Sequence, residues 1–164
     1  MNIALVMTSN PLYKNNFINN IIKKNRSEIK LLVELNFKSP KISVKNHYYN
    51  YFKLLGIKGL IYTGCIVLYN KLLSNFYNCL KIQNTNSLKS ISKTHSIDYV
   101  KINSVNSENF SQILKSNNID FVINSGNQIY GKNILKEWKG KIINRHSSLL
   151  PSYGGIYPIF WQLL

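Results

Sequence analysis

Short apolar runs alternate with amphipathic segments along most of this 164-residue chain, and this alternation limits the possible folds more than any other feature. We expect the apolar runs to be buried strands at residues 1–7, 28–35, 99–102, 120–124 and 141–143. Apolar side chains at helical spacing predict helices at residues 13–24, 107–114 and 134–138. Strands joined through helices usually pair in parallel, so the sequence predicts one α/β domain over residues 1–164, with a mostly parallel sheet.

Residues 47–80 depart from this alternation, because tyrosines and leucines lead into a longer apolar stretch. Its uninterrupted apolar part, residues 59–69, is shorter than the about 20 residues that a helix needs to cross a bilayer. Two interpretations are open. In the first, the segment forms one or two helices that pack on the sheet. In the second, it lies partly in a membrane interface, with Lys53, Lys58 and Lys71 facing anionic lipid and its tyrosines at the level of the headgroups.

The net charge of +15 favours anionic partners, but the composition offers a second explanation. The basic residues are almost all lysine, with Arg26 and Arg145 as the arginines, and Ala4 is the sole alanine. Abundant Lys, Asn and Ile with little Ala and Arg is also what an AT-rich coding sequence produces. In either case the field attracts anionic ligands such as nucleotide diphosphates or a membrane surface. Scarce arginine, and the lack of an RNA-binding or helix-turn-helix pattern, argue against nucleic acid.

The two cysteines and the start of the chain indicate a cytoplasmic protein. Cys65 and Cys79 lack the close spacing of zinc ligands, so no metal site is expected. Free thiols fit a reducing compartment. Residues 1–7 carry no basic segment ahead of the apolar run, so we interpret them as a first strand and not as a secretion signal.

The most specific chemical signal is an amide and an imidazole two residues apart, Asn144 and His146, at the end of the last apolar run. Alternation along a strand sends residues i and i+2 to the same face, so both side chains are expected to point beyond the strand end together. An imidazole can exchange a proton near neutral pH, and an amide can donate a hydrogen bond to a developing oxyanion. The pair therefore suits acyl transfer.

The surrounding run N-x-H-x-S-x-L-P-x-Y-x-G at residues 144–155 resembles the signature of the 10-formyltetrahydrofolate-dependent formyltransferases. Residues 119–126 resemble the strand that precedes this signature in the family, and residues 156–161 resemble the start of its next helix. The resemblance covers about the last third of the chain. It implies a Rossmann-like three-layer fold and 10-formyltetrahydrofolate as formyl donor.

The resemblance also implies roles for particular residues. Asn144 corresponds to the amide that binds the formyl oxygen, and His146 to the histidine that acts in the same tetrahedral step. The residues expected at the folate are Ser125, Gly126, Asn127, Gln128 and Ile129, with Leu150 and Pro151 as a fixed wall. An ordinary strand-to-helix turn at residues 125–129 is the alternative.

A third residue of the family, an aspartate farther along, orients the histidine, yet no Asp or Glu follows His146 in this sequence. We therefore expect a fold that is incomplete at its C-terminus, as in the N-terminal portion of a truncated formyltransferase, with little or no catalysis by these 164 residues.

The acceptor is expected to be a primary amine. The aromatic run at residues 157–161 looks more like the sugar-amine formyltransferases, which favours an amino-sugar nucleotide or a similar small amine. Two alternatives stay open: a methionyl-tRNA formyltransferase, and a non-catalytic α/β module that binds a ligand or nucleic acid.

Overall fold

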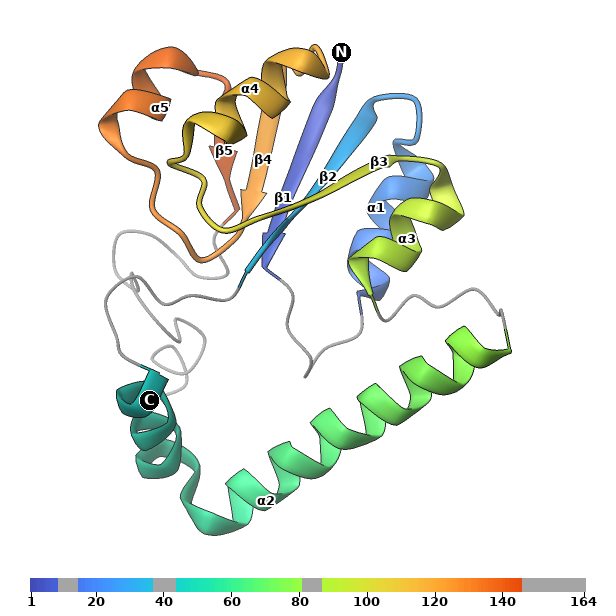
Figure 1. Ribbon diagram of the computed structural model, residues 1–164, viewed down its shortest axis with the longest axis vertical. Coiled ribbons are helices and arrows are strands. Elements are labelled where there is room, and N and C mark those ends of the chain that lie inside the picture. Colours follow the sequence, from blue (N-terminus) through green and yellow to red (C-terminus); the bar gives the residue numbers. More distant parts are fainter. Residues whose placement is uncertain (9–14, 37–43, 81–86, 146–164) are drawn as a thin grey trace.

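A five-stranded parallel sheet forms the centre of the protein in a computed structural model, which describes residues 1–8, 15–36, 44–80 and 87–145. The strands are β1 (Ile3–Thr8), β2 (Ile29–Leu35), β3 (Asp98–Ile102), β4 (Phe121–Ser125) and β5 (Ile142–Asn144). Their order across the sheet is β3-β2-β1-β4-β5, and every neighbouring pair is parallel (Figure 1). The predicted α/β fold with a parallel sheet is confirmed.

Helices cover both faces of the sheet. On one face lie α1 (Asn16–Lys24) and α3 (Leu88–His95), and on the other lie α4 (Glu108–Ser116) and α5 (Lys132–Glu137) (Figure 1). The period of two along a strand produces this division: in β1, Ile3 and Leu5 join the core under α1 and α3, whereas Ala4 and Val6 join the core under α4 and α5. The result is a three-layer arrangement.

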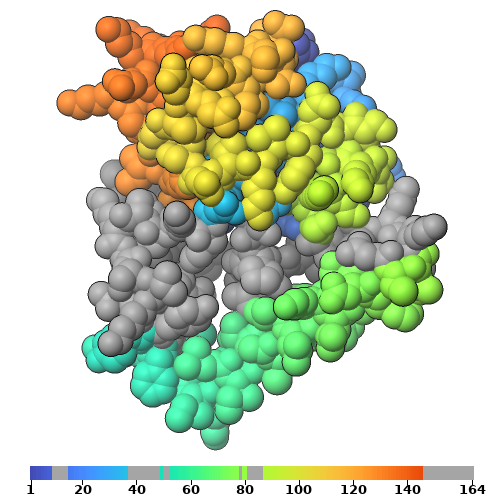
Figure 2. Space-filling model, in the orientation of Figure 1, coloured from blue at the N-terminus to red at the C-terminus, as the bar shows by residue number. Residues whose placement is uncertain are grey.

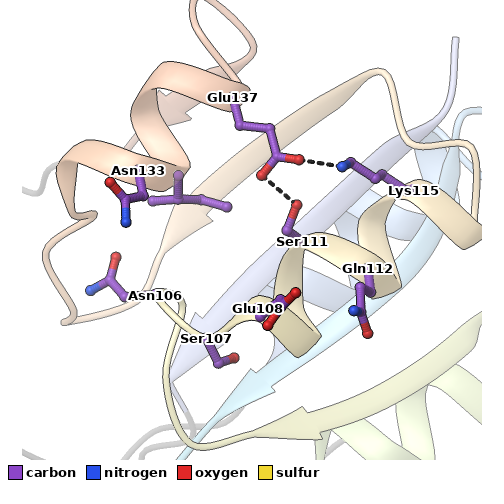
Figure 3. Close-up of a pocket in the computed structure, with 9 residues that line it drawn as sticks. Asn106, Ser107, Glu108, Ser111, Gln112, Lys115, Asn133 and Glu137 are labelled. Carbon is purple, nitrogen blue, oxygen red and sulfur yellow. Dashed lines mark hydrogen bonds and ion pairs between the residues drawn. The ribbon is translucent and has the colours of Figure 1, made fainter.

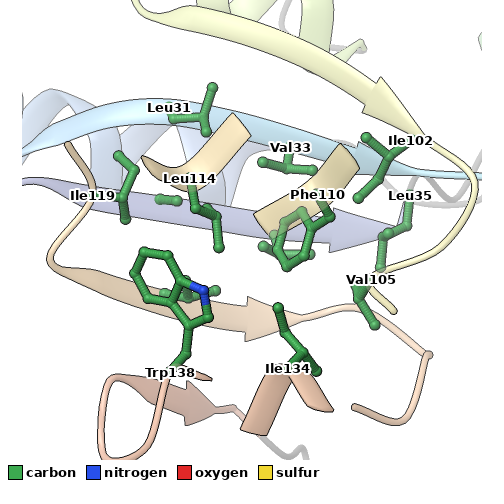
Figure 4. Close-up of a cluster of buried hydrophobic side chains, with 13 residues drawn as sticks. Leu31, Val33, Leu35, Ile102, Val105, Phe110, Leu114, Ile119, Ile134 and Trp138 are labelled. Atoms are coloured by element: carbon green, nitrogen blue, oxygen red, sulfur yellow. The ribbon is translucent and has the colours of Figure 1, made fainter. Parts of the chain in front are cut away.

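The core under α4 and α5 is closed by two aromatic side chains (Figure 4). Phe110 of α4 is fully buried over the middle of the sheet, and Trp138 packs at the end of α5. The Trp138 indole N–H donates to Ser111 Oγ at 3.4 Å, so its polar atom is paired inside the core. The predicted cap of α4 is also confirmed, because Ser107 Oγ accepts from the Phe110 backbone N–H at 3.3 Å.

The long helix α2 (Val44–Cys79) stands apart from this sandwich (Figure 2). It kinks at Gly56, whose φ of 62° lies in the region that favours glycine. It makes no extensive contact with any other described helix or strand. Residues 47–80 are helical, as one interpretation had it, but packing on the sheet is wrong. The reason is structural: α1, α3, α4 and α5 already cover both faces of the sheet, and α3 alone serves as the crossover helix between β2 and β3.

Within the described residues, the part of α2 from Phe52 to Tyr77 is long and apolar enough to cross a membrane, and none of that stretch is buried in the protein. The uninterrupted run at 59–69 understated this length, since isolated polar residues such as Thr63 and Asn70 do not end a helix.

Candidate active site

The candidate site lies at the edge of the sheet where the parallel strands end. The carboxyl ends of adjacent parallel strands meet at one edge, where ligands of open α/β sheets bind. Here β1 ends at Thr8, β4 at Ser125 and β5 at Asn144, and all three strands point the same way (Figure 1). Polar side chains follow apolar strands at this edge, which makes it suited to chemistry.

Two asparagine side chains face each other there. The register of β4 and β5 pairs Asn124 with Asn144, and Asn124 Nδ2 donates to Asn144 Oδ1 at 2.7 Å. The Arg145 backbone N–H donates to the Asn124 carbonyl at 2.7 Å, which continues the ladder past the last residue of β5. Asn124 is only 2% exposed, whereas Asn144 is exposed to solvent. The buried amide therefore holds the exposed one.

The orientation of the exposed amide follows from a backbone group. The Gly126 N–H can only donate, and it donates to Asn124 Oδ1 at 3.1 Å. Tyr130 Oη also donates to that oxygen, at 3.3 Å. The Asn124 NH₂ group must then face Asn144 and requires an oxygen from it, so the Asn144 NH₂ group points away from the pair. Among the described residues nothing accepts from Asn144 Nδ2, which leaves a donor directed at the strand edge.

The loop after β4 passes very close to neighbouring strands. A Cβ at Gly126 would overlap the side chain of Leu35 from β2, and it would lie 3.1 Å from Asn124 Oδ1 and 3.4 Å from Thr8 Oγ1. Leu35 is fully buried, so it has little room to move. Glycine at this position lets the loop lie directly over the ends of β1 and β2.

Side chains from three strand ends fix the rest of the loop. Thr8 Oγ1 donates to Asn127 Oδ1 at 3.0 Å and accepts from the Asn127 backbone N–H at 3.1 Å. The Gln128 amide accepts from the Val105 backbone N–H at 2.9 Å and donates to the Asn103 carbonyl at 2.8 Å. Asn106 clamps the far end, since its side chain donates to the Ile129 carbonyl and accepts from the Gly131 backbone N–H. The loop is thus held in one conformation before any ligand binds.

These contacts show which predicted residues the structure brings together. Residues 125–129 all lie at the same edge as Asn144. The side chain of Gln128 is engaged in holding residues 103–105, while the Ile129 side chain is exposed. His146, Leu150 and Pro151 lie outside the described residues.

Comparison with known proteins decides the family. A model of the family described as formyl transferase matches residues 65–164, which is more than half of the chain. The chain belongs to the formyl transferase family. The predicted family resemblance is therefore confirmed for this formyl transferase domain, and formyl transfer is the chemistry that its family name carries.

Sequence relatives include two methionyl-tRNA formyltransferases. The protein from Finegoldia magna is 39% identical over 69 residues, which is 42% of this chain and 22% of that protein. The protein from Sulfurovum sp. is 36% identical over 78 residues, which is 47% of this chain and 25% of that protein. The matches thus span about a quarter of each curated relative. Neither of these two names is that of a sugar-amine formyltransferase, so the finer resemblance stays a prediction.

Solved structures show the same fold over nearly the whole chain. Phosphoribosylglycinamide formyltransferase from Anaplasma phagocytophilum superposes with a TM-score of 0.57 at 14% identity, covering 99% of this chain and 57% of that one. The enzyme from Bacillus halodurans gives 0.56 at 17% identity, covering 99% and 64%. The formyl transferase domain thus spans less than two thirds of the length of either structure.

Sequence reasoning missed three residues of this edge: Thr8, Asn124 and Tyr130. Asn124 carried a usable signal, because it is a lone amide within the otherwise apolar run of β4 and is buried. Tyr130 donates to the same amide, and burial raises the pKa of its phenol well above the usual range, so it stays a neutral donor.

A separate hollow of about 440 Å³ lies between α4 and α5, outside the Asn124–Asn144 pair (Figure 3). At its rim Glu137 forms an ion pair with Lys115 and accepts from Ser111 Oγ at 2.6 Å. The hydrogen bond from Lys115, with a smaller one from Ser111, lowers the pKa of Glu137. Its carboxylate is thus committed to these partners. Within the described ranges, no group of three or more His, Cys, Asp or Glu side chains is placed to hold a metal ion.

Proposed function

We propose that this formyl transferase domain binds 10-formyltetrahydrofolate at the edge formed by β1, β4 and β5 and takes part in formyl transfer to a primary amine. The observation that carries the proposal is the Asn144 amide, whose NH₂ group is directed away from Asn124 by a chain of hydrogen bonds that begins at a backbone N–H. A donor fixed in this way requires no reorientation when an oxygen beside it gains charge.

The chain's own residues suggest a division of labour. The amine nitrogen attacks the formyl carbon, a C–N bond forms, and the bond from that carbon to the folate nitrogen breaks. Asn144 donates to the formyl oxygen as it becomes negative, a contribution of about 2.7–4 kcal/mol for one well-placed donor. His146 accepts the proton that the amine loses and returns one to the leaving nitrogen, so protons balance. The folate supplies the activated carbon, and the protein supplies position and field.

The edge fits a folate in two respects. The loop at residues 125–131 is rigid, and its exposed Ile129 offers an apolar side chain next to backbone carbonyls, a combination suited to a flat heterocycle with polar edges. The net charge of +15 attracts the anionic tail of a folate.

A stable folate pair tests donor binding without requiring turnover. We would titrate the chain with 10-formyl-5,8-dideazafolate and with the same compound lacking the formyl group. Asn144→Ala is expected to reduce the preference for the formylated ligand about two- to tenfold, the range of one hydrogen bond. Asn133→Ala is the matched control, because Asn133 is an exposed asparagine of α5 that lines the separate hollow. Equal effects of both variants, or no binding of either ligand, would contradict the proposal.

The acceptor we favour is an amino-sugar nucleotide or a similar small amine, supported by the aromatic run at residues 157–161 and by the attraction of a cationic protein for diphosphates. Methionyl-tRNA is the second candidate, and the names of the sequence relatives favour it. Formylation of the two acceptor classes under identical conditions discriminates them through kcat/KM. Folate binding with no formylated product from either class would favour a non-catalytic module.

A further inference from the structure

Helix α2 presents a continuous apolar row to solvent. Among its exposed side chains, six lie three or four residues apart and therefore on one face of the helix: Ile57, Ile61, Cys65, Leu68, Leu72 and Phe76. Each large apolar side chain of the row is more than half exposed. A surface helix of a water-soluble protein normally turns such a row toward the core.

The opposite face of α2 is the more polar one, yet it is the one that is partly covered. Thr63, Asn70 and Ser74 are spaced at seven and four residues on that face, and all three are less exposed than the apolar row. The helix is thus amphipathic in the inverted sense, with its apolar face outward. A contiguous exposed apolar patch of this kind marks a binding surface.

The charges on α2 indicate what covers the patch. No Asp or Glu occurs between residues 44 and 80, and Lys53, Lys58 and Lys71 are exposed along the helix. A second copy of α2 would bring like charges together, which disfavours self-association. An anionic bilayer instead accepts both the lysines and the apolar row. Tyr62 and Tyr69 are exposed beside that row and suit the level of the headgroups.

The sheet decides how the helix meets the bilayer. Strands β2 and β3, which precede and follow α2, pair with each other from Leu31 opposite Asp98 to Leu35 opposite Ile102. Both ends of the α2 segment must therefore stay on the same side of a membrane. One crossing would separate two hydrogen-bonded neighbours, and within the described residues only one stretch is long enough to cross. Length permits a span, but topology excludes it.

We infer that α2 is an in-plane membrane anchor, which lies in the headgroup region of an anionic bilayer with its Ile57-to-Phe76 row toward the acyl chains. It holds the sheet on one side of that bilayer. Strands β1 and β4 point toward the side of the molecule on which α2 runs, so the edge that carries Asn124 and Asn144 faces the anchor (Figure 1).

Vesicle flotation of the chain tests the anchor, with phosphatidylcholine vesicles that contain or lack about 30% phosphatidylserine. Binding is expected with the anionic vesicles and is expected to weaken at high salt. Leu72→Asp in the apolar row is expected to reduce binding by about tenfold or more. Leu135→Asp on α5 is the matched control, because it makes the same change at a leucine that is 46% exposed against 60% for Leu72. This control is expected to bind like the parent chain.

Two readouts separate the anchor from its alternatives. Cys79, at the end of α2, can be labelled with a fluorophore after Cys65→Ser, and an impermeant quencher added outside should reach it fully on bound vesicles. Protection of that label would mean crossing and would overturn the in-plane arrangement. Absence of flotation, together with a dimer in light scattering that Leu72→Asp dissociates, would assign the row to a second copy. Equal loss in both Leu→Asp variants would overturn the role of the row. Thermal melts confirm that each variant is folded.

Discussion

The sheet and helix α2 are similarly rich in leucine, isoleucine and aromatic side chains, but the two regions use them in opposite ways. In the sheet and its four covering helices these side chains form two closed cores. In α2 they face solvent, and the polar side chains of the same helix are the ones partly covered. The difference shows that apolar content specifies a demand for burial without specifying the surface that meets it.

The largest contrast is expected between two phenylalanines. Phe110 is fully buried in the core under α4, whereas Phe76 of α2 is 59% exposed. Phe110→Ala should lower the free energy of unfolding by about 3–5 kcal/mol, because it removes buried area and leaves a cavity. Phe76→Ala should change it by less than about 0.5 kcal/mol. Urea unfolding of the two variants measures this. Similar losses would mean that α2 packs on the folded domain after all.

Two glycines should respond with opposite signs. Gly126→Ala forces a Cβ against Leu35 and Asn124, so it should destabilise the fold by about 1–3 kcal/mol. Gly64 lies within α2 with open space around it, so Gly64→Ala should stabilise the helix by roughly 0.5–1 kcal/mol. Thermal denaturation tests the first change, and helicity by circular dichroism in the presence of anionic vesicles tests the second. A stabilising Gly126→Ala would show that the loop does not require such a close approach.

A finer effect concerns the pair of amides. Asn124→Asp keeps an oxygen for the Gly126 N–H but places a second oxygen against Asn144 Oδ1, so the Asn144 amide is expected to turn and donate to it. The donor for a formyl oxygen is then lost although Asn144 is still present. The preference for formylated over unformylated dideazafolate should fall about two- to tenfold. An unchanged preference in a folded Asn124→Asp protein would show that Asn124 does not position Asn144.

The smallest effect is expected at the surface ion pair of Glu137. Lys115 and Ser111 lower the pKa of this carboxyl, so its stabilising contribution is present above the pKa of the unfolded chain and is lost as pH falls through the lower folded value. Glu137→Gln should therefore flatten the fall in melting temperature at acid pH and leave neutral stability nearly unchanged. Melting curves across the acid range provide the measurement. An unchanged acid slope would show that the pair contributes nothing there.

How far the sequence predicts this molecule depends on whether a pattern is local. Alternating apolar runs predicted the strands and the parallel sheet, and Ser107 predicted the cap of α4, because each rests on neighbouring residues. The spacing of Asn144 after Ile142 and Ile143 predicted its place at the strand edge. The part played by Asn124 could not be predicted, since it depends on the register between β4 and β5, twenty residues apart along the chain. The position of α2 could not be predicted either, because packing on the sheet and contact with lipid require the same apolar side chains.

The parallel pairing of β2 with β3 makes the long helix a detachable insert. Its two ends return to neighbouring strands, and α3 already completes the crossover on its own. A short glycine–serine linker in place of α2 should leave the sheet and both cores intact and yield a version that no longer requires detergent or lipid. The same geometry means that a related domain can gain or lose a tether to the lipid surface through one insertion, with the chemistry at the strand edge unaltered.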